Sequence, residues 1–217
     1  MRRALTLLEL IFTIVIIAMV FTVIPKVIYS FNKADTFSMR EDALFNGLSD
    51  IKLITQLPWD QNNTEYNDIL HTDSNQAEFE CNDTTKRRVG GFIGSRNCEH
   101  NLSASAISSD GESDKIYYND IDDFNDINVS VDLGVDNIYT ISNEVSYMSD
   151  AIFNYDYTNQ SVTVNLANTV ESTPSTNIKE VRAEIYYTGK RGGQRELSRF
   201  YYYSTNIGQV LIKKRSW

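Results

Sequence analysis

The sequence predicts an α+β protein, in which a long N-terminal helix is followed by a β-rich antiparallel globular domain. Three observations predict this fold. A run of apolar residues lies near the N-terminus, apolar residues with helical spacing follow it, and short β-prone segments separated by Asn, Asp, Ser and Gly fill the rest. A chain of 217 residues is long enough for one sizeable core and an extension.

The apolar run extends from Ala4 to Pro25 and contains one charged residue, Glu9. At about 1.5 Å per residue, a helix of this length reaches roughly the ~30 Å of a bilayer's hydrocarbon core. We therefore expect a transmembrane helix over about residues 5–28. An ordinary cleaved signal peptide is the alternative, but large or charged side chains follow the run where signal peptidase needs small ones.

Membrane orientation follows from the basic residues at the N-terminus. Arg2 and Arg3 precede the apolar run, and no comparable basic cluster comes immediately after it. Because basic flanks stay in the cytoplasm, we expect a single-pass inner-membrane protein with a cytoplasmic N-terminus and a periplasmic C-terminal domain.

The helix should continue beyond the membrane as an amphipathic segment, because apolar residues recur at helical spacing among charged ones. Pro58 removes a backbone donor and disfavours helical geometry before it, so we expect the helix to cover residues 5–57. Pro25, inside this helix, predicts a bend or local melting. The β-rich domain then covers residues 58–217.

The clearest strand signals lie near the C-terminus. Segments 179–188 and 196–204 flank a Gly-rich turn at residues 189–193, which predicts an antiparallel hairpin. Other predicted strands have β-prone composition, and they cover residues 115–118, 137–141, 151–157, 161–166 and 209–213.

The N-terminal residues resemble the class III signal of type IV prepilins and type II secretion pseudopilins. In that family a short basic leader ends in a small residue, and an apolar residue, Thr, two aliphatics and Glu follow, as in the stretch from Arg2 to Glu9. The resemblance implies a leader of residues 1–4 that prepilin peptidase cuts between Ala4 and Leu5. It also implies N-methylation of the new terminus at Leu5.

The resemblance further implies an assembly role for Glu9. An ionised side chain near the start of a membrane span costs on the order of 2–3 kcal/mol unless it finds a partner. In the family that partner is the N-terminal amine of a neighbouring subunit. The alternative is a carboxylate that reaches the interface from the first helical turn, near the positive end of the helix dipole.

Two further sites are predicted from the residues of the β-rich domain. Cys81 and Cys98 are the only cysteines, and in an oxidising compartment they predict a disulfide. An acidic stretch supplies oxygen ligands for calcium, which some pseudopilins bind, although a solvated acidic loop is the other interpretation. The candidate ligands are Asp110, Glu112, Asp114, Asp120 and Asp122.

The net charge argues against a nucleic-acid-binding protein, and the motifs give no sign of an enzyme. A net charge of -9 argues against a nucleic-acid partner, and no catalytic motif marks an enzyme or calls for another cofactor. We therefore expect a structural subunit, a minor pseudopilin or prepilin, of a type II secretion or type IV pilus filament. Its expected partners are other pilin subunits, prepilin peptidase and the inner-membrane assembly platform. The alternative function is a periplasmic enzyme or binding domain held by an uncleaved signal anchor.

Overall fold

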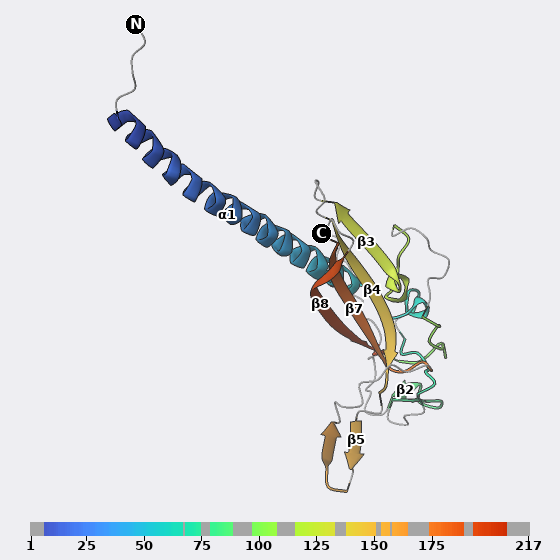
Figure 1. Ribbon diagram of the computed structural model, residues 1–217. Coiled ribbons are helices and arrows are strands. Elements are labelled where there is room, and N and C mark those ends of the chain that lie inside the picture. The colour runs from blue at the N-terminus through green and yellow to red at the C-terminus, as the bar shows by residue number, and fades with distance from the viewer. Residues whose placement is uncertain are drawn as a thin grey trace, which may run out of the picture. The chain divides into compact units, whose positions relative to one another are not determined.

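The structure is a computed structural model that describes residues 7–66, 68–74, 79–88, 97–107, 116–132, 138–150, 153–156, 158–164, 174–188 and 193–207. The chain divides into two compact units, Met1–Leu44 and Phe45–Trp217. The second unit contains the strands and the last turns of the helix (Figure 1). The α+β class predicted from the sequence is therefore confirmed.

Helix α1 covers Leu7–Ile54 and continues through Pro25 without interruption, so a bend at this proline stays a prediction. The helix ends at Ile54 rather than at the expected Leu57. The Thr55 N–H still bonds four residues back to Ile51 O, and from Gln56 onward the spacing tightens to three residues, as in the 3.0 Å bond from Gln56 N to Leu53 O. The segment before Pro58 is thus a tighter turn, not a further α-helical turn.

The main sheet has the strand order β3-β4-β7-β8, with every neighbouring pair antiparallel. The four strands are drawn together in Figure 1. Their bounds are Ile127–Asp132 for β3, Ile138–Met148 for β4, Ile178–Thr188 for β7 and Gln194–Thr205 for β8. The predicted hairpin is confirmed as β7–β8, and a register shift between Ile185 and Tyr186 leaves Leu197 as an extra residue in β8.

One face of this sheet is the core of the second unit. Alternate residues of β7 point inward and are buried, among them Val181, Ala183 and Ile185. The last turns of α1 pack on this face through Ile51 and Ile54. Trp59, Leu70, Ile121 and Phe124 from the loops complete the same cluster.

Polar contacts also join the end of α1 to the central strand β4. The Asn46 side-chain amide donates to the Tyr139 hydroxyl at 2.5 Å, and the Asn143 amide donates to Asp50 Oδ2 at 2.5 Å. Because Tyr139 and Asn143 are buried, these bonds satisfy polar groups that would otherwise weaken the packing of the helix on the sheet.

Short elements surround the sheet. Two pairs of strands form antiparallel ladders, namely β1 (Cys81–Asn82) with β2 (Arg87–Arg88) and β5 (Phe153–Asp156) with β6 (Ser161–Val164). Two 3₁₀ helices, η1 (Gln61–Asn63) and η2 (Asp122–Phe124), lie in the loops. The predicted strand at 115–118 is wrong for residues 116–118, which form a turn and loop, and segment 209–213 lies outside the described residues.

Candidate functional site

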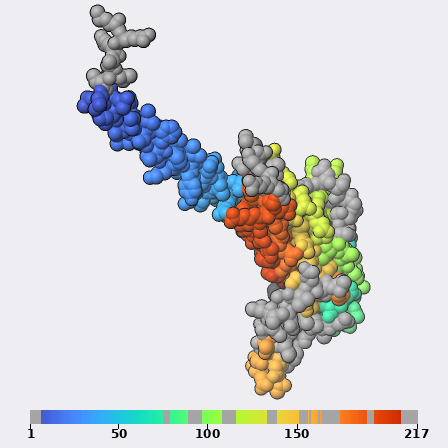
Figure 2. Space-filling model, in the orientation of Figure 1, coloured from blue at the N-terminus to red at the C-terminus, as the bar shows by residue number. Residues whose placement is uncertain are grey.

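The N-terminal part of α1 is strongly apolar and uncovered. An 18-residue window of this helix has a mean hydropathy of 2.8, and none of it is buried. Leu7 and Phe12 keep 78% and 67% of their surfaces exposed, and Figure 2 shows the bare side chains of this segment in dark blue. Within the described residues the chain therefore has one candidate membrane-spanning helix.

Glu9 lies in the first turn of α1, and its side chain is exposed. The other polar side chains of this apolar segment bond to their own helix. The Thr13 hydroxyl is 3.0 Å from the carbonyl oxygen of Glu9, and the Thr22 hydroxyl donates to Met19 O at 2.7 Å. These threonines therefore need no external hydrogen-bond partner. The assembly role expected for Glu9 stays a prediction.

The predicted cleavage and methylation sites, Ala4 and Leu5, lie outside the described residues. Processing at Ala4 and modification of Leu5 therefore stay predictions.

A buried ionic cluster lies in the second unit, under the sheet. Lys179 of β7 has no exposed surface. Its Nζ donates to Trp59 O at 2.9 Å, to Asp60 Oδ2 at 3.1 Å and to Asp122 Oδ2 at 2.7 Å. The same Nζ lies 4.0 Å from the centre of the Trp59 ring and 5.1 Å from that of Tyr147. The three donors of the ammonium group are thus all engaged in a site without solvent.

More acidic groups adjoin this cluster at η2. Asp120 Oδ1 accepts the backbone N–H groups of Asp122 and Asp123 at 2.8 and 3.2 Å. Burial raises the pKa of Asp120 to about 8, and the negative charges of Asp122 and Asp123 act in the same direction. Burial also raises the pKa of Asp122 to about 6, although the charge of Lys179 opposes this. The protonated acids are therefore favoured here more than in water.

The predicted calcium ligands are described only in part. Asp120 and Asp122 bond to η2 and to Lys179, whereas Asp110, Glu112 and Asp114 lie outside the described residues. No group of three or more metal-binding side chains is found within the described ranges. A calcium site centred on the other three carboxylates stays a prediction.

The predicted disulfide is present and joins Cys81 of β1 to Cys98, with 6.4 Å between their Cα atoms. Cys98 is buried, and its N–H donates to Lys86 O at 3.1 Å. The bond therefore ties the β1–β2 turn to the loop that follows it.

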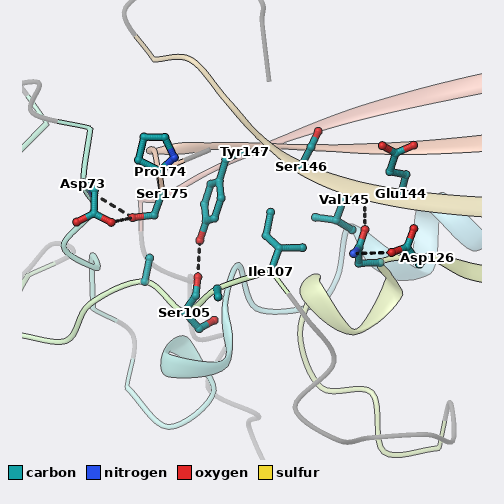
Figure 3. A pocket seen from close by; sticks show the side chains of 13 residues that line it. Asp73, Ser105, Ile107, Asp126, Glu144, Val145, Ser146, Tyr147, Pro174 and Ser175 are labelled. Carbon is teal, nitrogen blue, oxygen red and sulfur yellow. Dashed lines mark hydrogen bonds between the residues drawn. The ribbon is translucent and has the colours of Figure 1, made fainter. Parts of the chain in front are cut away.

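An open groove of about 730 Å³ lies beside the β4 strand (Figure 3). Tyr147 reaches across one end, where its hydroxyl donates to Ser105 O at 2.8 Å. At the same end the Ser175 hydroxyl donates to Asp73 Oδ2 at 2.8 Å. The lining residues that the structure describes include no histidine or cysteine, and the Ser175 hydroxyl is bonded directly to the Asp73 carboxylate.

The buried lysine was not among the residues predicted from the sequence. A signal for it exists in the alternation of β7, because Lys179 has the same inward phase as Val181 and Ala183. A charged residue at an inward position of a central strand has to find partners. Asp60 is distant in sequence, so it could not be assigned as that partner without the fold.

Comparison with protein-family models, curated proteins and solved structures found no match to the chain.

Proposed function

We propose that the chain is a filament-forming subunit of the type IV pilin-like kind, made as a prepilin or pseudopilin precursor. The observation that carries this proposal is the uncovered apolar segment of α1 with Glu9 in its first turn. Such a surface needs a non-aqueous environment before assembly, which a bilayer supplies. Packing against the same segment of other copies would supply it afterwards.

The order of helix and strands along the chain also supports this proposal. One long helix is continuous from the apolar segment into an antiparallel β domain. That domain carries a disulfide, which is typical of proteins outside the cytoplasm. The residues before the helix add a basic pair and a small residue at the proposed cut, as in the prepilin signal.

The proposed life cycle has two stages. The precursor stands in the inner membrane with Arg2 and Arg3 in the cytoplasm, and prepilin peptidase removes residues 1–4. The amine created at Leu5 then pairs with Glu9 of a neighbouring copy as the assembly platform moves the subunit into a filament. A buried pair of this kind fixes the register between helices, because a carboxylate without its partner is costly in apolar surroundings.

Processing is tested by expressing the full chain with and without a prepilin peptidase and measuring the mass of its N-terminal peptide. We expect loss of residues 1–4 only with the peptidase, and an Ala4→Leu variant should keep them. Retention of the leader in all cases would contradict the proposal and favour an anchored periplasmic domain.

Assembly is tested with Glu9→Leu in cells that process the protein normally. We expect at least a tenfold loss of cross-linked multimers, because the charge that matches the new amine is gone. Glu41→Leu is the matched control, since Glu41 is an exposed acidic residue of the same helix outside the apolar segment. Equal multimer yields for Glu9→Leu and the parent chain would refute the assembly role.

A further inference from the structure

The Lys179 cluster has a composition that supports a chemical reaction as well as an ion pair. The amine of Lys179 lies within hydrogen-bond distance of two carboxyl groups in a site closed to solvent. Trp59 and Tyr147 cover the amine with aromatic rings. Such a pair is not hydrated, and a proton transfer within it yields a neutral amine beside a neutral carboxylic acid.

The two carboxyl groups differ in what holds them. Asp60 Oδ1 accepts the N–H of Asn62 at 3.0 Å, and its Oδ2 accepts the N–H of Ser105 at 2.9 Å. These backbone donors fix the position of the Asp60 carboxyl group. Its Oδ2 is also 3.1 Å from Lys179 Nζ, so Asp60 can exchange a proton with that nitrogen while remaining in place.

Asp122 is held from one side only. Its Oδ2 is 2.7 Å from Lys179 Nζ and 3.5 Å from the Ser105 hydroxyl. Its Oδ1 is buried and finds no hydrogen-bond partner within the described residues. Oδ2 is therefore the oxygen of Asp122 that can receive protons from Lys179, and fewer hydrogen bonds hold Asp122 in place than hold Asp60.

We propose that Lys179 and Asp122 condense to form an intramolecular amide bond between the β7 strand and the η2 helix. The ammonium group of Lys179 first gives one proton to Asp122 Oδ2, which leaves a neutral amine beside a neutral carboxylic acid. The Nζ lone pair attacks the carboxyl carbon, and the new N–C bond forms as that carbon becomes tetrahedral.

Collapse of this intermediate breaks the bond from the carboxyl carbon to the departing oxygen. The departing oxygen is Oδ2, which already carries the first proton from Lys179. Asp60 takes a second proton from the positively charged nitrogen, to which it is hydrogen-bonded, and passes it to Oδ2, which leaves as water. Asp60 is then again the carboxylate that it was at the start. The net change is the loss of one water from an ammonium carboxylate pair, and no oxidant or co-reactant is needed.

The product fits the contacts already present. The amide nitrogen keeps one N–H, which can donate to Trp59 O or to Asp60. The bond would close a covalent loop between residues 57 positions apart in the chain. It would therefore restrict the unfolded chain as a disulfide does, without being sensitive to reductants. This inference does not depend on the proposed filament function.

Tryptic digestion of the full chain, reduced and denatured, tests the proposal directly. Between Lys115 and Arg182 the only cleavage site is Lys179, and trypsin does not cut after an acylated lysine. We expect a peptide of residues 116–182 that is lighter than its sequence mass by one water. Fragmentation should give no separate fragment ions from backbone cleavage between Asp122 and Lys179, because the amide bond still holds the two sides together.

Three outcomes would overturn the proposal. The first is a peptide of residues 116–179 with its full mass. The second is a peptide of residues 116–182 with its full mass, which would arise if trypsin cuts slowly after Lys179 because Glu180 follows it. The third is a loss of water with normal cleavage after Lys179, which would indicate an aspartyl succinimide.

Variants identify the reacting acid. Asp122→Ala should restore cleavage after Lys179 and the full mass, and Asp60→Asn should lower the fraction of joined chains at least tenfold after equal times. Asp73→Asn is the control and should keep the joined peptide, because Asp73 bonds to Ser175 and not to Lys179. A joined peptide in Asp122→Ala, or unchanged joining in Asp60→Asn, would refute the assigned roles even if the wild-type chain is lighter by one water.

Discussion

Gly47 lies where α1 passes closest to the sheet, and its replacement by alanine gives a test of that packing. A Cβ atom at this position would lie 3.1 Å from Phe200 Cε2 and 3.2 Å from Ile185 Cγ1. It would lie closer still to Ile185 Cδ1. Carbon atoms in contact prefer about 3.5–4.0 Å, so the added methyl group overlaps with two side chains.

Two effects of opposite sign decide the result. Alanine in a helix interior is favoured over glycine by about 0.5–1 kcal/mol. Overpacking a well-packed core costs about 1–3 kcal/mol, and Ile185 is fully buried, so its side chain has little room to move. We therefore expect Gly47→Ala to lower the free energy of unfolding by about 1 kcal/mol, because the difference between these effects spans about 0–2.5 kcal/mol.

The same contact predicts a compensating change. Ile185→Val removes Cδ1 and should by itself cost about 0.5–1.5 kcal/mol. In the double variant the new methyl group would fill part of that space, so we expect the combined loss to be smaller than the sum by about 1 kcal/mol or more.

Chemical unfolding in detergent micelles, followed by tryptophan fluorescence, gives the free energy of unfolding of the parent chain, the two single variants and the double variant. Ile141→Val serves as a control partner, since Ile141 is a buried isoleucine of β4 that is absent from the close contacts of Gly47. Stabilisation by Gly47→Ala, or strict additivity with Ile185→Val, would refute the close approach of helix and sheet.

The remaining predictions concern the disulfide and the buried acids. Replacing Cys81 and Cys98 together by serine should lower the free energy of unfolding by about 3 kcal/mol, because the closed loop no longer restricts the unfolded chain, and a reductant should have the same effect on the parent chain but none on the variant. Because the pKa of Asp120 is raised to about 8 from 3.8, the folded state binds more protons than the unfolded state between these values, so stability should fall as the pH rises through this window. Asp120→Asn should flatten that decline, by on the order of 2–4 kcal/mol across the window, and an unchanged pH profile of unfolding in this variant would contradict the assignment.

The parts of the fold that were predictable depend on local patterns. The apolar run and the helical spacing predicted α1, and the Gly-rich turn between two β-prone segments predicted the β7–β8 hairpin. The helix end was misplaced because Pro58 constrains its neighbours without deciding how the last turn closes. Strand β3 was missed even though its residues alternate, since Ile127–Asp132 is short and follows an acidic loop.

The buried cluster could not be predicted as a unit because its members meet only in the folded chain. Lys179, Asp60 and Asp122 come from a strand, a loop and a 3₁₀ helix. Asp122 was assigned to a calcium site because neighbouring acids in sequence suggest a cation, and the cation that the structure places there is a lysine. The pairing of Cys81 with Cys98 needed no such information, because no other cysteine was available.

The extra residue at Leu197 bears on how copies of this chain can associate. Among the residues that the structure describes, β8 is an outer strand of the four-stranded sheet, and the edge of an outer strand is a template for pairing with another chain. A bulge breaks the regular spacing of those groups and twists the strand locally, so a straight partner strand could follow β8 for only part of its length. Continuous sheets running from copy to copy are thereby disfavoured, and so is lateral growth into fibrils.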